Sequence, residues 1–411
     1  MSLFKNRFLL ALLTLTVYEL LMVLFNPTGL TFVKVAITLL VWISFLLSAL
    51  SFLLNLRTIR TNMPGYAYKF FIILMMWNIF NIFRSLTQGV GSLTTLFGNS
   101  YTSLALLVPL SLSFGFYKSN LKRMIHYTCT VIILGIFAFI IFFIFSNETT
   151  NLIYNRVFFL IFYSIVFLIT IIPFQSNKIK FLIVVGSIIL FYIAIIGGSR
   201  TMMVRLPLLY LALTIIYFIK KFNAKWILKV SFIAIIVPFY FLQASLNSGE
   251  SFFEGYLSKT NNKDLSTDTR TFLYLEVFDD LVHNGNLIFG KGANGTYFSN
   301  YFNTAGGDTD NRLSSEVGIL ALLLKGGLLA VFLNLTVLII AIYLSFFQSN
   351  NYFLVGIGFM LLIHILLLFV ENLINYNMYN FLIWFFIGIC LSNGIRALNN
   401  KQISKILKYG K

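Results

Sequence analysis

The sequence contains few charged residues, very few acids, and almost none of the residues that build disulfide or metal frameworks. Asp, Glu, Lys and Arg make up 10% of its 411 residues, whereas they make up about a quarter of a soluble domain. The two cysteines, Cys129 and Cys390, both lie inside apolar runs, so they indicate neither a disulfide framework nor a metal cluster. We therefore expect an integral membrane protein with no metal and no cofactor.

Apolar residues make up 59% of the chain, and their runs are long enough to cross a bilayer. A transmembrane helix needs about 20 mostly apolar residues, and on this rule the sequence predicts an all-α membrane protein with about twelve spans. The predicted spans cover residues 8–25, 31–55, 68–84, 100–117, 124–146, 152–174, 180–197, 203–219, 226–246, 314–346, 352–371 and 378–395.

The only long polar segment is residues 247–313, which holds 9 of the 13 acidic residues, including every aspartate. The chain thus divides into an N-terminal bundle of about nine helices (1–246), this polar loop (247–313), about three C-terminal helices (314–395) and a basic tail (396–411). Within the loop, residues 266–280 have the spacing of an amphipathic helix that can lie on the membrane surface as a lid. Its apolar positions include Phe272, Leu275, Phe278 and Val282.

Positive residues predict the orientation, because short cytoplasmic loops carry an excess of Lys and Arg. They collect in alternate connections and in the tail, whereas the connections around Asn26, Asn147 and Asn375 carry almost none. Both termini are therefore predicted to be cytoplasmic and the long loop extracytoplasmic. The net charge of +17 is explained by this distribution, so we expect the bilayer rather than a nucleic acid as the partner of the basic residues.

Several ionisable residues fall at one predicted depth, toward the outer ends of their spans. They are Glu19, Arg84, Arg205, Glu316 and Glu371. Charged groups inside a membrane are costly and usually face a water-filled cavity or the bundle interior. We therefore expect a cavity covered by the long loop, with a helix-stapling ion-pair network as the alternative.

A glycine-rich junction, Gly197-Gly198-Ser199-Arg200-Thr201, precedes the eighth predicted span, and Arg205 follows one turn later. Glycines let the backbone approach a ligand closely, and amides at a helix start favour an anion. Guanidinium groups match phosphate oxygens in a two-pronged geometry. The junction therefore predicts a phosphate site.

These motifs resemble those of the O-antigen polymerase and O-antigen ligase superfamily of bacterial surface-polysaccharide enzymes. The resemblance is confined to about residues 195–330, and it also rests on topology. Its motifs are Gly198-Ser199-Arg200, Thr269-Arg270, Gly290-Lys291-Gly292, Asn311-Arg312, Ser314-Ser315-Glu316 and Gly326-Gly327.

The resemblance implies a GT-C-like glycosyltransferase of the bacterial cytoplasmic membrane that uses neither a metal nor a nucleotide sugar. Its donor would be a glycan on undecaprenyl diphosphate. Arg200 and Arg270 would hold the diphosphate, with Arg205 as a third residue, and the outer-side arginines Arg312 and Arg84 are counted with this set. A chain-length regulator and a flippase are the protein partners that such an enzyme has.

The general base is left open by the sequence. Ligases of the superfamily carry a histidine before the asparagine that ends the loop, and here Asp310 takes that place. Asp310 needs desolvation to act as a base near neutral pH, because the reference pKa of aspartate is about 3.9. Glu316 and His283 are the alternatives.

The function predicted is a polysaccharide polymerase for capsule, exopolysaccharide or O-antigen. It would transfer a growing glycan from its lipid diphosphate onto a lipid-linked repeat unit. The missing histidine favours this over a ligase of the same superfamily. A lipid-linked oligosaccharide flippase is the alternative from another class, and it would place charges along a path through the membrane rather than at one face.

Overall fold

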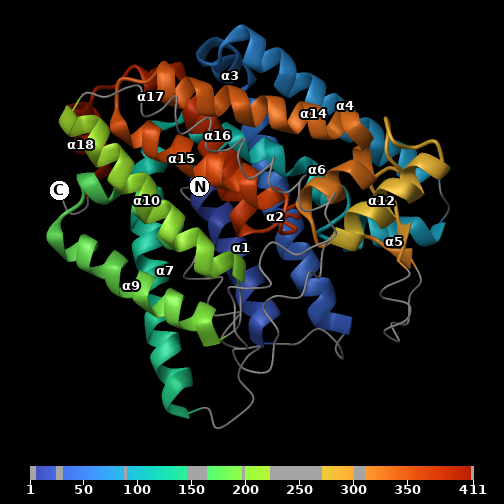
Figure 1. Cartoon of the computed structure of the whole chain (residues 1–411), viewed down its shortest axis with the longest axis horizontal. Helices are drawn as coiled ribbons and strands as arrows, with labels where there is room; N and C mark the ends of the chain where they lie inside the picture. The colour runs from blue at the N-terminus through green and yellow to red at the C-terminus, as the bar shows by residue number, and fades with distance from the viewer. Residues whose placement is uncertain are drawn as a thin grey trace.

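The computed structural model describes residues 6–24, 31–87, 90–145, 164–196, 200–222, 271–299 and 311–408 (Figure 1). Within these ranges the chain is almost entirely helical, with one antiparallel pair of two-residue strands. The predicted span 226–246, most of the long loop, and the side chains of Arg200, Arg270 and Asp310 lie outside the described residues.

Most of the helices follow the predicted apolar runs. In chain order the elements are α1 (Arg7–Leu24), α2 (Thr31–Leu54), α3 (Leu56–Asn62), α4 (Gly65–Leu86), α5 (Val90–Gly98), α6 (Ser103–Leu107), the 3-10 helix η2 (Val108–Phe116), α7 (Lys118–Phe145), the 3-10 helix η3 (Ile172–Phe174), α9 (Asn177–Ile196), α10 (Arg200–Phe222), α12 (Thr271–His283), β1 (Tyr297–Phe298), β2 (Asn311–Arg312), α14 (Gly318–Phe347), α15 (Tyr352–Leu368), α16 (Met378–Leu391), α17 (Asn393–Arg396) and α18 (Asn400–Leu407).

Four helices in the described part are long and apolar enough to cross a membrane, judged by length and composition. These segments are Val35–Leu54 in α2, Gly65–Leu86 in α4, Asn177–Ile195 in α9 and Gly318–Phe347 in α14. Shorter apolar helices accompany them, at Ser103–Phe116, Ser164–Phe174, Met203–Ile219, Tyr352–Leu368 and Met378–Leu391. The composition and these helices together indicate an all-α membrane protein.

Two predicted spans have a different structure from the one expected. Residues 103–116 form a short α-helix followed by nine residues of 3-10 helix, and α16 has 14 residues. At a rise of 1.5 Å per residue, α16 is about 21 Å long, which is less than the roughly 30 Å of a hydrocarbon core. The two elements pack closely, since a Cβ added to Gly388 would lie 2.1 Å from the Leu112 carbonyl oxygen.

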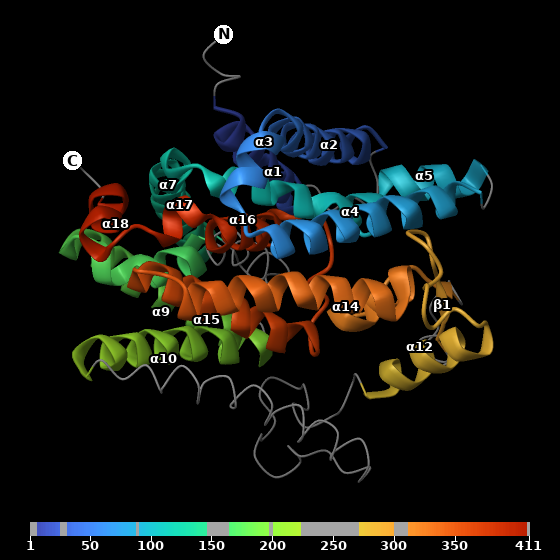
Figure 2. The ribbon, with the colours of Figure 1, turned by 90° about the horizontal axis from the view of Figure 1, so that it is seen from above.

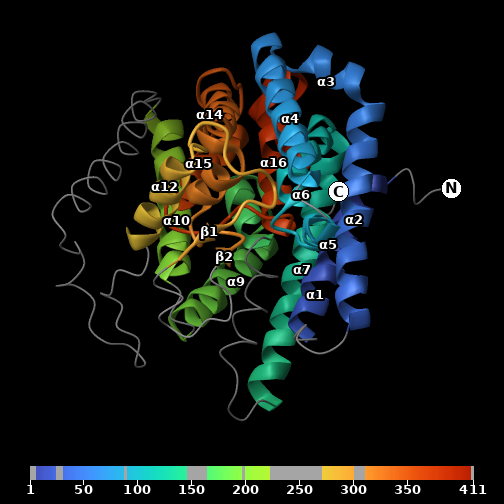
Figure 3. The same cartoon turned by 90° about the vertical axis from the view of Figure 1, so that its right-hand side faces the viewer.

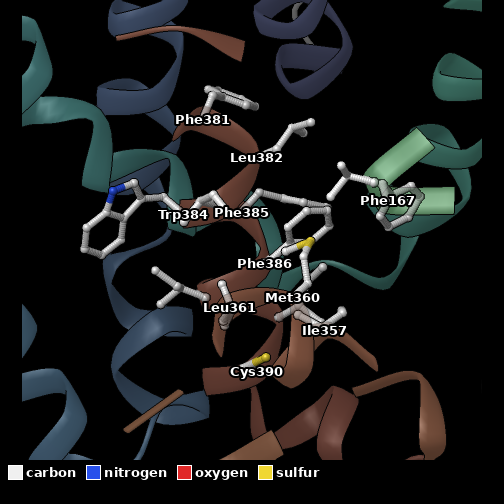
Figure 4. Close-up of a cluster of buried hydrophobic side chains, with 14 of the residues drawn as sticks. Phe167, Ile357, Met360, Leu361, Phe381, Leu382, Trp384, Phe385, Phe386 and Cys390 are labelled. Carbon is white, nitrogen blue, oxygen red and sulfur yellow. The ribbon is translucent and has the colours of Figure 1, made fainter. Parts of the chain in front are cut away.

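The core of the bundle is apolar and aromatic, and it lies around α16. Phe381, Phe385 and Phe386 are almost fully buried there. Figure 4 shows Phe386 on the side of α16 that faces Phe167 and Met360 of α15, and the Phe167 ring stacks on that of Phe386 with centroids 5.3 Å apart. N-terminal and C-terminal helices therefore share one core.

Helices α4, α14, α15 and α10 form a series through the molecule. Helix α14 packs against α4 and against α15, and α15 packs against α10. The two side views agree that α4 lies on one side of α14 and α15, and α10 on the other (Figures 2 and 3).

The α12 helix lies at the beginning of α14 beside the strand pair (Figure 2), and it confirms that the loop contains a short helix. A second stripe of the helix, Leu273, Val277 and Leu281, is fully buried against Tyr297 and the start of α14. Of the apolar stripe named from the sequence, Phe272 packs against this buried cluster, whereas Leu275, Phe278 and Val282 are about half exposed or more. Both faces of α12 are therefore apolar, and the predicted stripe remains available for a membrane surface.

Candidate functional site

Helix α14 is interrupted at Gly326 and Gly327, and the loop segment 286–294 fills the interruption. In an unbroken helix, the backbone amides and carbonyls on the two sides of this point would bond to each other. Here they bond to the loop segment instead. The four bonds run from Leu328 N to Leu287 O (2.9 Å), from Leu329 N to Ile288 O (3.3 Å), from Lys291 N to Leu324 O (2.7 Å) and from Gly292 N to Lys325 O (2.9 Å). The two glycine motifs noted in the sequence thus meet in space.

Glycine is required at this junction by conformation and by space. Gly327 has φ 67° and ψ −170°, a region that only glycine adopts readily. A Cβ on Gly327 would lie 2.1 Å from the carbonyl oxygen of Ile288, and one on Gly290 would lie 2.5 Å from the Gly327 nitrogen. The loop and the helix can approach this closely only without side chains.

Helix α4 holds the same loop segment from the other side. The Arg84 guanidinium donates to the carbonyl of Phe289 (3.1 Å) and to that of Gly290. Ser85 Oγ accepts from the amide of Asn294 (3.1 Å). The Nζ of Lys325, a fully buried residue, donates to the Ala293 carbonyl (2.8 Å). The segment 286–294 is therefore fixed between α4 and α14.

The predicted arginine Arg205 lies in α10 and forms an ion pair with Glu371, with Nη2 and Oε2 2.5 Å apart. The Arg205 side chain is 3% exposed and that of Glu371 22%. The guanidinium lies over the Tyr379 ring, 5.1 Å from its centroid, and the Tyr379 hydroxyl hydrogen-bonds His364 Nδ1 (3.0 Å). His364 is thus a buried, hydrogen-bonded residue.

A short non-helical segment, residues 369–377, connects this ion pair to the rest of the site. The carbonyl of Glu371 accepts from the Gly318 amide (3.0 Å), and Asn372 donates to Ser314 Oγ (2.9 Å). On its other side, the Tyr376 amide donates to the carbonyl of Ser100 (3.0 Å). The segment therefore links the end of α15 to the residues at the start of α14 and to Ser100.

A second charged pair lies where the strand pair meets α14. Arg312 Nη2 is 3.3 Å from Glu316 Oε1, and Ser299 Oγ donates to Glu276 of α12 (2.6 Å). Burial raises the pKa of the Tyr297 phenol, and the positive charge of the neighbouring Arg312 offsets part of this rise. These residues join α12, both strands and the start of α14 into one polar cluster.

The remaining predicted residues lie apart from this cluster or outside the described residues. His283 ends α12, is exposed, and hydrogen-bonds the Asp279 carbonyl through Nδ1 (2.8 Å). Arg84 contacts the 286–294 segment on the α4 side of α14. The Arg200 backbone begins α10, but its side chain, like Arg270 and Asp310, is not described.

Among the residues singled out in the sequence, the structure pairs Arg205 with Glu371 and Arg312 with Glu316, and it adds a connection that sequence reasoning missed. Glu371 and Asn372 bond to Gly318 and Ser314, residues that flank Glu316. The run Glu371-Asn372-Leu373-Ile374-Asn375-Tyr376-Asn377, with three asparagines between two apolar spans, is the signal that could have revealed it. Among the residues described, no group of three His, Cys, Asp or Glu side chains could hold a metal ion.

Comparison with protein-family models, with curated proteins and with solved structures gave no match to this chain.

Proposed function

We propose that this chain is a polysaccharide polymerase of the bacterial cytoplasmic membrane, a GT-C-like glycosyltransferase with about twelve spans. It transfers a growing glycan from undecaprenyl diphosphate onto a lipid-linked repeat unit at the outer face. The proposal is supported by the sequence motifs and by the arrangement of charged groups. Its orientation, with both termini cytoplasmic, follows from the distribution of Lys and Arg.

One observation carries the proposal: the pairs Arg205–Glu371 and Arg312–Glu316 occur at one end of the bundle, linked through residues 314–318 and 371–372. At the other end of the bundle, the basic C-terminal segment bonds to the residues around Gln175 and Asn350. The Gln175 side chain donates to the Leu407 carbonyl, and the Asn350 amide donates to the carbonyl of Arg396. Since α15 (352–368) runs between Asn350 and Glu371, the charge pairs and the basic C-terminal segment lie at its opposite ends.

Each group has a chemical role in the transfer. The acceptor hydroxyl oxygen attacks the anomeric carbon of the donor glycan, its proton goes to a general base, and the bond from that carbon to the diphosphate oxygen breaks. Arg205, with Arg200 and Arg270, stabilises the negative charge that develops on the departing diphosphate. Glu371 fixes the orientation of Arg205 through one guanidinium nitrogen. Glu316, Asp310 or His283 takes the proton.

Replacement of Arg205 tests this assignment. Arg205→Gln should slow chain elongation by about a hundredfold, the usual effect of removing one group that stabilises developing charge. The measurement is elongation by the purified chain in vesicles supplied with the lipid-linked repeat unit of the producing organism.

The matched control is Arg396→Gln. Arg396 is also an almost fully buried arginine with side-chain partners, Gln348 and Asn393, but it lies at the basic end of the bundle. This variant should elongate at close to the wild-type rate. Equal elongation by Arg205→Gln and wild type, with both chains folded, would exclude Arg205 from the transfer.

A further inference from the structure

An open pocket of about 580 Å³ lies beside the outer-side half of α4, where the segment 286–294 reaches that helix. Its walls combine three aromatic rings with two cationic side chains and one amide. The lining residues are Trp77, Phe80, Arg84, Asn286, Phe289 and Lys291. The Trp77 ring lies 5.2 Å from Phe80, stacked, and 5.9 Å from Phe289, centroid to centroid. Rings of this kind offer stacking faces for a sugar or an isoprenoid.

The pocket opens beside an apolar face of α4 that the rest of the described chain leaves uncovered. Ile73, Met76, Phe80 and Phe83 recur at three- and four-residue steps along this face, and each is about half exposed or more. In a membrane protein such a face contacts lipid. An isoprenoid or acyl chain lying on it has its head group at the level of Arg84.

The charge of the pocket is suited to a phosphate. Lys291 is paired with Asp280, with Nζ and Oδ2 2.5 Å apart, whereas Arg84 bonds to two backbone carbonyls. Within the described ranges Arg84 is not in an ion pair with any carboxylate. Among the described residues its positive charge is therefore not compensated by an acid, and a bound anion would supply the missing charge.

This pocket is separate from the Arg205–Glu371 pair. Helices α14 and α15 lie between α4 and α10 (Figure 3), and packed helices are about 8–10 Å apart. Three such spacings separate α4 from α10, so the two cationic positions are about 25 Å apart by this spacing.

We propose that the Arg84 pocket holds the diphosphate of the second lipid-linked substrate, the acceptor repeat unit. This inference rests on the proposed function. A polymerase of this kind binds two lipid diphosphates at once. The donor reacts at the carbon bonded to its own diphosphate, so that diphosphate lies at the reaction centre. The acceptor reacts at the hydroxyl farthest from its diphosphate, so its anchor lies away from the reaction centre by the length of a short oligosaccharide. Two separate cationic positions, one by Arg205 and one by Arg84, have this arrangement.

The test is the number of carrier molecules bound, with undecaprenyl diphosphate as the probe and native mass spectrometry of the full-length chain as the measurement. The wild-type chain should bind two. Asn286→Asp places a carboxylate in the pocket without removing the Arg84 bonds that hold the loop segment. The variant should weaken the second binding event at least tenfold. The new carboxylate and the bound diphosphate are both negative, and they repel each other more strongly away from bulk water. Asn99→Asp makes the same charge change outside the pocket and keeps its acceptor bond to the Tyr101 amide, so it should still bind two.

Two competitors identify the source of the phosphate. Neither excess phosphatidylglycerol nor inorganic pyrophosphate should displace the second carrier from the wild-type chain. Displacement by phosphatidylglycerol would make the pocket a general anionic-lipid site, and displacement by pyrophosphate would make it a site for the free anion. Either result would overturn the inference.

The same experiment separates this inference from the proposed function. If Asn286→Asp still binds two carriers while Arg205→Gln binds one fewer than wild type, the Arg84 pocket is not the acceptor site and the proposed function stands. If neither substitution changes carrier binding, both proposals fail.

Discussion

Replacing Gly327 by alanine should detach the loop segment 286–294 from α14. Alanine at φ 67° and ψ −170° costs about 1–3 kcal/mol in backbone strain,. The new Cβ would also lie 2.1 Å from the Ile288 carbonyl oxygen, so the loop must move and its four bonds to the helix are lost. Accommodating this Cβ in the docked state costs about a further 1–3 kcal/mol. The docked arrangement should therefore lose about 3 kcal/mol or more, a shift of roughly a hundredfold in its equilibrium.

Hydrogen exchange over residues 286–294, followed by mass spectrometry in detergent, measures this equilibrium directly. Gly285→Ala is the matched control, because Gly285 also has a positive φ of 65°, yet nothing lies within 4 Å of an added Cβ. It should carry only the backbone strain of about 1 kcal/mol. Equal protection of the segment in the two variants would refute the account of the helix break.

Two further changes test other contacts. Glu371→Gln removes the carboxylate from an almost fully buried Arg205 and should destabilise the chain by about 3 kcal/mol, whereas the double change with Arg205→Met should cost less. Thermal unfolding in detergent compares the stability of the single and double variants. A loss of stability in the double variant equal to the sum of the losses in the two single variants would contradict the pairing. Gly388→Ala should cost at least about 3 kcal/mol or prevent folding, since its Cβ would meet the Leu112 carbonyl. Gly394→Ala, whose nearest neighbour would be 3.7 Å away, should fold normally, and similar yields of the two variants would contradict the close packing of α16 on η2.

The positions of the helices could be predicted because long apolar runs have few other structures open to them in a membrane. The 3-10 helix at residues 108–116 could not, because hydropathy along the chain is the same for both kinds of helix. The glycine pairs at residues 290–292 and 326–327 were visible in the sequence. Their pairing was not, since it depends on backbone bonds between segments more than thirty residues apart.

Helix α12 and the segment 369–377 show a second limit of the sequence. Both Leu273-Val277-Leu281 and Leu275-Phe278-Val282 have helical spacing, so periodicity cannot choose the face that packs on the protein. In segment 369–377, Glu371 was recognised as a charge at the end of a span. Its bonds to Arg205 of α10 and to Gly318 at the start of α14 follow from the packing of three helices, which a single chain pattern does not encode.

Polymerisation by this chain is tested most directly by counting carrier molecules released per glycosidic bond formed. Vesicles containing only the purified chain are supplied with a lipid-linked repeat unit, and both glycan length and free undecaprenyl diphosphate are measured. The proposed function predicts a ladder of longer lipid-linked glycans with one carrier released for each repeat unit added. Movement of the repeat unit across the bilayer, with no elongation and no released carrier, would contradict it.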